Sequence, residues 1–181
     1  MSSAIKILPH YTYEEYCLWE GRWELIDGIP YAMSPAPTPE HQLLGGNLIT
    51  EFNNAIKKQK CKHCKVFEFI DVKVSEDTIL QPDISIVCKP IIKNFLDFPA
   101  TLVVEILSPA TAFKDRHVKF PLYEKMGIKY FLLINIDKRS IEINMLQNSQ
   151  YLLTTYAENE AFQFVLEDDC KIDAELNNIW E

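Results

Sequence analysis

The stretch Leu102-Val103-Val104-Glu105-Ile106-Leu107 decides the fold, because it is an apolar run interrupted by a single acid. A short, nearly continuous apolar run is typical of a central strand that is covered on both faces. A carboxylate buried in such a strand costs several kcal/mol unless it is paired or bound to a metal. Glu105 therefore predicts a partner cation, which is an arginine, a lysine or a metal ion.

Helix and strand patterns alternate along the rest of the chain, and turn signals such as Asp27-Gly28 separate them. The expected elements are a helix at 12–20, hairpin strands at 23–25 and 30–33, a long helix from 40, a strand at 66–74, a strand beginning at 84–87, a strand at 102–107, a helix ending at 126, and strands at 130–136, 140–145 and 151–156. Together they predict an α/β fold with a central mixed β-sheet flanked by α-helices. The length suits one domain over residues 1–181.

The helix after the central strand has recognisable start and stop signals. Thr111 or Asp115 can cap its N-terminus, and Gly127 stands at the C′ position. Because Pro121 falls inside it, we expect a kink there or a late start near residue 118.

The net charge of −8 first argues against a nucleic-acid partner, but the charge is unevenly distributed. Residues 158–181 contain eight acids and one lysine, so the rest of the chain is nearly neutral. Local potential governs phosphate binding more than net charge does. The candidate nucleic-acid-binding residues are Lys57, Lys58, Lys60, Lys62 and Arg116. The alternative is that these residues form a solvated face.

The location expected from the sequence is the cytoplasm. No window approaches the apolar length of a transmembrane helix, so no membrane span is expected. The first residues also lack the basic start and apolar stretch of a secretory signal.

The five cysteines are odd in number and scattered, which argues against a disulfide framework. Cys61-Lys62-His63-Cys64 has the spacing of half a zinc site. A closed site needs four ligands, and no second pair at zinc-ribbon or zinc-finger spacing accompanies this one. The favoured interpretation is two thiols in a solvated, lysine-rich turn.

Asp83 is the second acid that the pattern singles out, since it follows Pro82 and precedes an apolar strand. Two carboxylates on neighbouring strands, with a lysine nearby, form a hard-oxygen site suited to Mg²⁺. Such an ion polarises a phosphate oxygen and lowers the pKa of a bound water. Pro-Asp is also a common turn dipeptide, and a strand glutamate is often paired only structurally.

Several runs along residues 10–180 resemble the Uma-two (Uma2) family, bacterial proteins described as restriction-endonuclease-like within the PD-(D/E)XK superfamily. These runs are residues 22–28, 33–35, 39–41 and 47–48, Gln81-Pro82-Asp83-Ile84, residues 102–109, Asp115, Lys119, Tyr123 and residues 127–130. The resemblance implies a nuclease core, a divalent metal (Mg²⁺ or Mn²⁺) and endonucleolytic hydrolysis of phosphodiester bonds in DNA. It also favours a homodimer, because one active site cuts one strand and duplex cleavage needs two.

Matched position by position, the resemblance makes Asp83 and Glu105 the motif acids and metal ligands. The superfamily lysine normally stands two residues after the second acid, where this chain has Leu107. Lys119, on the following helix, is the candidate replacement that positions the attacking water. Tyr123 stands four residues later, on the same helix face.

Weaker candidates support this set. Glu24 matches a family glutamate and would support the metal through a water, or would form a salt bridge to Arg22 or Lys6. His41 would contact the scissile phosphate or only tie down the proline-rich loop before it, residues 34–39. Asp115 is a helix cap rather than a ligand.

The alternative function belongs to another class. The chain would then be a catalytically inactive protein with a nuclease fold that binds nucleic acid or protein. The displaced lysine and the acidic C-terminal segment favour this alternative, whereas an intact set of Asp83, Glu105 and Lys119 favours the enzyme.

Overall fold

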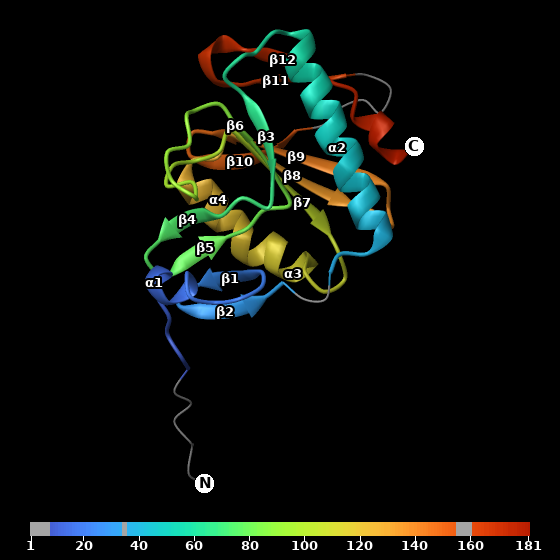
Figure 1. The fold of residues 1–181 in the computed structure, drawn as a ribbon. Coiled ribbons are helices and arrows are strands. Elements are labelled where there is room, and N and C mark those ends of the chain that lie inside the picture. The colour runs from blue at the N-terminus through green and yellow to red at the C-terminus, as the bar shows by residue number, and fades with distance from the viewer. Residues whose placement is uncertain (1–7, 34–35, 155–160) are drawn as a thin grey trace.

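A six-stranded mixed sheet, in the order β10-β9-β8-β7-β6-β3, runs through the centre of the protein (Figure 1). The computed structural model describes residues 8–33, 36–154 and 161–181. The strands are β3 (Lys65–Glu68), β6 (Ile84–Val87), β7 (Leu102–Leu107), β8 (Tyr130–Asn135), β9 (Ser140–Gln147) and β10 (Gln150–Thr154). β7 and β8 pair in parallel and the other neighbours are antiparallel. The mixed α/β fold predicted from the sequence is confirmed.

A smaller sheet with the order β2-β1-β5-β4 lies at one end of the central sheet (Figure 1). Its strands are β1 (Trp23–Ile26), β2 (Ile29–Ala32), β4 (Val72–Ser75) and β5 (Thr78–Leu80). The predicted hairpin at Asp27-Gly28 is confirmed, because both residues have the positive φ angles, 49° and 74°, that a tight hairpin turn requires. A third sheet consists of β11 (Phe162–Val165) and β12 (Lys171–Ala174).

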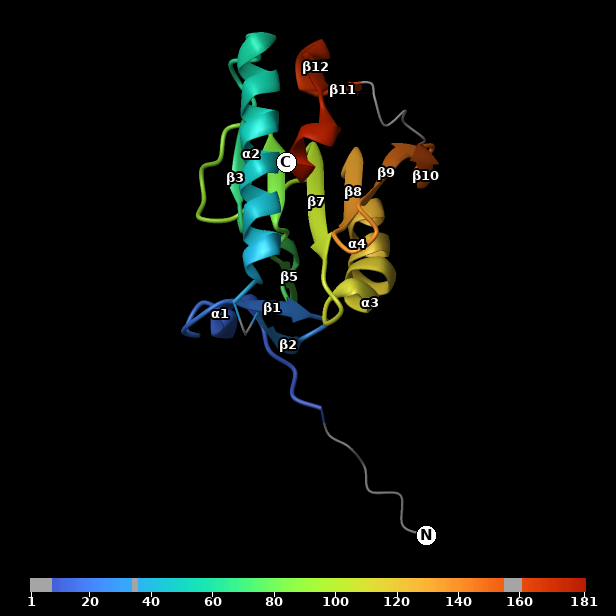
Figure 2. The same ribbon diagram turned by 90° about the vertical axis from the view of Figure 1, so that its right-hand side faces the viewer.

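Helices cover both faces of the central sheet (Figure 2). α2 (Pro39–Lys58) lies on one face, and the other carries α3 (Ala112–Lys114), the π-helical turn η1 (Asp115–Lys119) and α4 (Phe120–Met126). Three short helices complete the fold: α1 (Tyr13–Tyr16), η2 (Glu167–Asp169) and η3 (Leu176–Trp180). Within the described ranges, no helix combines the length and apolar character that crossing a membrane requires.

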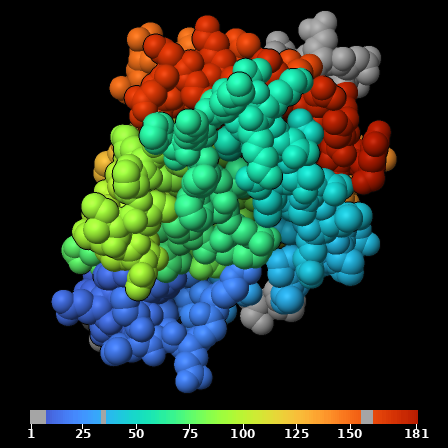
Figure 3. All heavy atoms as spheres, turned by 45° about the horizontal axis from the view of Figure 1, so that its top comes forward, coloured from blue at the N-terminus to red at the C-terminus, as the bar shows by residue number. Residues whose placement is uncertain are grey.

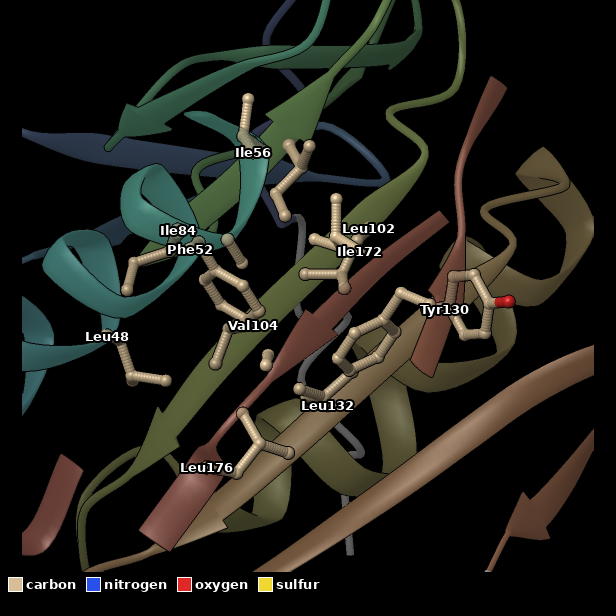
Figure 4. Packing of buried hydrophobic residues seen from close by; sticks show 14 of the residues in the cluster. Leu48, Phe52, Ile56, Ile84, Leu102, Val104, Tyr130, Leu132, Ile172 and Leu176 are labelled. Atoms are coloured by element: carbon tan, nitrogen blue, oxygen red, sulfur yellow. The ribbon is translucent and has the colours of Figure 1, made fainter. Parts of the chain in front are cut away.

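The two faces of β7 contact different cores. Leu102, Val104 and Ile106 pack toward α2 with Leu48 and Phe52 (Figure 4). The alternate residues Val103 and Leu107 pack on the opposite face, toward α4. Because side chains alternate along a strand, Glu105 points to this second face.

Some predicted boundaries are wrong. The helix expected over 12–20 ends at Tyr16, where the Tyr16 hydroxyl donates to the Trp23 carbonyl and to Asp71 and so ties the chain back. The strand expected over 66–74 is split at Phe69, whose φ of 52° turns the chain from the central sheet into the small one. Residues 34–35 of the predicted loop and 155–156 of the last predicted strand lie outside the described residues, as does residue 6.

The helix after β7 begins with an irregular segment. Pro121 lies in the first turn of α4, and the π-helical turn η1 comes immediately before it, in the region where a kink was predicted. Gly127 adopts the left-handed conformation at φ 84°, which confirms the predicted helix end. Thr111 is the N-cap position, so the prediction that Asp115 caps this helix is wrong. Asp115 lies inside the helical segment and is buried, because the wide turn points it inward.

The prediction that the cysteines form no disulfides is also wrong. The structure pairs Cys61 with Cys170 and Cys64 with Cys88, and it leaves Cys17 free and exposed. The partners are 109 and 24 residues apart, so their spacing carries no local signal.

Candidate functional site

Asp83 and Glu105 meet at the pairing of β6 with β7. The antiparallel register pairs Ile84 with Val104. Asp83 precedes Ile84 and Glu105 follows Val104, so the two acids lie opposite each other. One Asp83 oxygen, Oδ2, accepts the backbone N–H of Ile106 at 2.8 Å. Both acids are buried, with 9% and 3% of their surfaces exposed.

Lys119 projects from η1 into the same region and is almost completely buried. Its ammonium lies near three carboxylates, at 2.6 Å from Glu24 Oε1, 2.9 Å from Glu105 Oε1 and 3.4 Å from Asp115 Oδ1. Burial alone would lower the pKa of Lys119, but these carboxylates raise it well above its ordinary value. Lys119 is therefore a permanently charged group at the centre of the site.

Glu24 comes from β1 of the small sheet and is fully buried. It accepts the backbone N–H of Gln81 and binds both Lys119 and Lys114. Burial raises the pKa of Glu24, but the two lysines lower it below its usual value, so this carboxyl is ionised. Arg22, one of its predicted partners, donates to the side chain of Gln81 instead.

Lys114 is the residue of the site that sequence reasoning missed. It lies 90 positions from its partner Glu24, and no local pattern connects a helix lysine to a strand acid at that distance.

Tyr123 lies one turn after Lys119, and its hydroxyl donates to Glu105 Oε1 at 2.7 Å. Burial raises the pKa of Tyr123 well above its usual value, so the hydroxyl remains a hydrogen-bond donor. Burial also raises the pKa of Glu105 well above its usual value, and the neighbouring acids Asp115 and Asp83 oppose the effect of Lys119. The four carboxyl groups of the site, Glu24, Asp83, Glu105 and Asp115, thus outnumber its two lysines, Lys114 and Lys119.

His41 stands at the start of α2, where Thr38 caps the helix and accepts the His41 backbone N–H. Its side chain does more than hold the loop, because Nε2 lies 3.3 Å from Asp83 Oδ2. Burial lowers the pKa of His41, but the contact with Asp83 outweighs this effect and raises it. The contact with Asp83 therefore favours the protonated form of the imidazole.

The predicted nucleic-acid-binding residues do not join this cluster. Lys57 and Lys58 end α2, at the opposite end from His41, which is roughly 25 Å away at 1.5 Å per residue. Lys60 and Lys62 follow in the next turn. Arg116 forms an ion pair with Glu142 of β9.

The oxygen-rich donor set suits a hard divalent cation. Two buried side-chain oxygens of the described residues have no hydrogen-bond partner, Asp115 Oδ1 and Ser85 Oγ, and Ser85 stands two residues after Asp83. Asp115 Oδ1 is within ion-pair distance of Lys119 but lacks the geometry of a hydrogen bond. Over the described ranges, no group of three or more His, Cys, Asp or Glu side chains is arranged to hold a metal ion. Mg²⁺ commonly binds through one or two carboxylates and takes its other ligands from water and phosphate, so Asp83 and Glu105 fit such an ion.

Comparisons with known proteins agree with this fold. The model of the Uma2 family, described as "Putative restriction endonuclease", matches residues 12–173. An uncharacterised protein of Synechocystis sp. is 32% identical over 144 residues, which cover 76% of this chain and 74% of that protein. A crystal structure from Anabaena variabilis, titled a "putative nuclease belonging to DUF820", superposes with a TM-score of 0.73. It is 17% identical and the match covers 94% of this chain and 99% of the other, so the likeness extends over the whole fold.

Replacing Lys119 with methionine should destabilise the protein strongly. The variant keeps the apolar stem but leaves Glu24 and Glu105 buried without their shared cation, so we expect the free energy of unfolding to fall by about 3–5 kcal/mol. Urea denaturation followed by circular dichroism measures this change. Lys125→Met, at an exposed position on the same helical segment, is the matched control and should shift stability by less than about 0.5 kcal/mol. Equal losses in both variants would show that the buried charge is not what Lys119 contributes.

Proposed function

The chain belongs to the Uma2 family, and from this premise we propose that it is a metal-dependent endonuclease acting on DNA. The description of this family as "Putative restriction endonuclease", and the likeness of the fold to that of a protein titled a "putative nuclease", support nuclease function. The observation that carries the proposal is the placement of Asp83 beside Glu105 with the Lys119 ammonium 2.9 Å from Glu105 Oε1. Two acids and a charged lysine are the groups that metal-assisted phosphodiester hydrolysis needs.

Asp83 and Glu105 would hold Mg²⁺ or Mn²⁺, which when bound polarises a phosphate oxygen and lowers the pKa of a bound water. Lys119 orients the attacking water and opposes the negative charge that develops on the phosphate oxygens. Tyr123 fixes the Glu105 carboxylate through its hydrogen bond. Glu24 holds Lys119 from the side of the small sheet. The imidazole of His41, whose protonated form Asp83 favours, would face the anionic phosphate.

Leu107 occupies the place of the usual lysine and packs into the core toward α4. The charge that this position normally supplies comes instead from Lys119, which approaches Glu105 from the helix that covers the strand. The site thus keeps the required positive charge although the motif has lost its lysine.

Asp83→Asn and Glu105→Gln should each abolish Mg²⁺ binding and plasmid nicking, because each removes one anionic metal ligand. Calorimetric titration with Mg²⁺ and Mn²⁺, and nicking of supercoiled plasmid on the same samples, measure both effects. Asp137→Asn, at an exposed turn, is the matched control and should retain both activities. Circular dichroism of each variant separates loss of the site from loss of the fold.

One observation favours the alternative, a nuclease fold without catalysis. Lys119 already compensates Glu105 and Glu24, so these acids can be buried without a metal. A wild-type protein that binds neither Mg²⁺ nor Mn²⁺ and nicks no plasmid would establish this alternative.

The lysines at the end of α2 are proposed to contact the DNA backbone away from the cut. Lys57→Gln/Lys58→Gln should weaken binding to a duplex and reduce the slope of log affinity against log salt by about 2, near one for each phosphate that the variant no longer neutralises. Fluorescence anisotropy with a labelled duplex, in Ca²⁺ to prevent cleavage, measures this slope. Lys125→Gln/Lys138→Gln removes the same amount of exposed charge elsewhere and should leave the slope unchanged. Equal effects of both pairs would assign the change to net charge alone.

Duplex cleavage further implies a homodimer, since each proposed site cuts one strand. Light scattering of the protein with and without DNA tests this part of the proposal.

A further inference from the structure

Four cysteines from three separate segments line one cavity, at the opposite end of α2 from His41 and the acid cluster. The cavity has a volume of about 450 Å³ and is lined by Cys61, Cys64, Cys88 and Cys170. Cys61 lies in the turn after α2 and Cys64 directly before β3. Cys88 directly follows β6, and Cys170 directly precedes β12. Figure 3 shows the end of α2 and the C-terminal segment adjacent to each other on the surface.

The backbone holds these four positions close together. The Cα atoms of Cys61 and Cys170 are 6.0 Å apart, and those of Cys64 and Cys88 are 3.9 Å apart. Cys64 and Cys88 continue the register of β3 with β6, in which Lys65 pairs with Val87. A turn at residues 62–63 brings Cys61 and Cys64 together, and such a turn spans less than about 7 Å between its ends. All four side chains therefore line one cavity; as disulfides they are not arranged to hold a metal ion, and the proposed site requires their reduction.

We propose that, when reduced, these four cysteines form a structural zinc site. A Cys-x-x-Cys pair completed by two further cysteines is a closed, tetrahedral ligand set for Zn²⁺, with Zn–S distances of about 2.3 Å. Thiolate sulfur favours Zn²⁺ over the hard cations that suit Asp83 and Glu105. A reducing compartment, such as the cytoplasm predicted from the sequence, keeps cysteines as thiols.

The two forms are related by a balanced exchange. Each disulfide accepts two electrons and two protons from a thiol reductant, which is oxidised to its own disulfide. The four resulting thiols then release four protons as their sulfurs bind one Zn²⁺. In the disulfide form the sulfurs carry no charge and are not metal ligands.

The proposed cluster would carry a charge of −2 and would lie partly within the apolar core. Cys64 and Cys88 belong to the apolar core toward α2, and Cys61 and Cys170 pack against that core, so much of the site is shielded from solvent. The other charged groups around the cavity are three lysines, Lys60, Lys62 and Lys171, and three acids, Glu167, Asp168 and Asp169. Its place in the fold gives the ion a structural role, since it joins the end of α2, the β3–β6 edge and the C-terminal hairpin.

Metal binding by the untagged, full-length protein tests the proposal. After reduction with a phosphine reductant and removal of metals under nitrogen, the wild type should bind one Zn²⁺ per chain. Titration with Co²⁺ should give thiolate-to-cobalt charge transfer and the strong visible bands of a tetrahedral site. The same protein oxidised to its disulfides should show neither signal. This comparison needs no variant, so misfolding of a mutant cannot obscure it.

Variants then identify the ligands. Cys61→Ser and Cys170→Ser should each weaken Co²⁺ binding at least tenfold, whereas Cys17→Ser, at the exposed free cysteine, should bind as the wild type does. His63→Ala should also bind normally, which excludes a site of three cysteines and one histidine. If the reduced wild type gives no tetrahedral Co²⁺ spectrum, or binds no more tightly than Cys61→Ser/Cys170→Ser, the proposal is wrong and the cysteines serve only as disulfides.

Discussion

The buried ammonium of Lys119 is the group on which the arrangement of the structure depends. It joins Glu105 of the central sheet to Glu24 of the small sheet, and it reaches both from the helix that covers them. A charged group so deeply buried is stable only while its partners stay in hydrogen-bond contact. The position of the small sheet against β7 is therefore set by charge as well as by apolar packing. The π-helical turn serves the same end, because its wide geometry points both Asp115 and Lys119 inward.

The acidic side chains of this network outnumber the basic ones. Glu24, Asp83, Glu105 and Asp115 face two lysines and one histidine, and burial and mutual repulsion raise the pKa of both Glu105 and Asp115. An added cation attracts a buried carboxylate more strongly than it attracts an exposed one, because little solvent screens the two charges. Under the proposed function, a metal ion held by Asp83 and Glu105 would add positive charge beside these acids.

The sequence predicts the parts of this site that depend on short-range pattern. Glu105 is marked by its apolar neighbours, Asp83 by its place before a strand, and Tyr123 by its helical spacing from Lys119. The links between distant segments carry no such mark, and they include the bond of Lys114 to Glu24 and both cysteine pairs. These contacts depend on strand register and on how the sheets pack. Neither can be recognised from a short stretch of a single sequence. The assignment of Asp115 as a cap failed because the helical segment already begins after Thr111 and continues through a π-helical turn that contains Asp115.

The two ends of α2 place two different kinds of chemistry on one rigid element. His41 at its start contacts Asp83, and Cys61 lies in the turn just after its end, roughly 25 Å away or slightly more. Between them Leu48 and Phe52 are fully buried against the central sheet, so the helix has no freedom to slide without opening that core. A change of bonding at the cysteines therefore alters how firmly the C-terminal hairpin is held while leaving His41 and Asp83 in place. The helix α2 thus connects the carboxylate cluster at its start with the cysteines that follow its end, and it keeps the two sets of side chains apart.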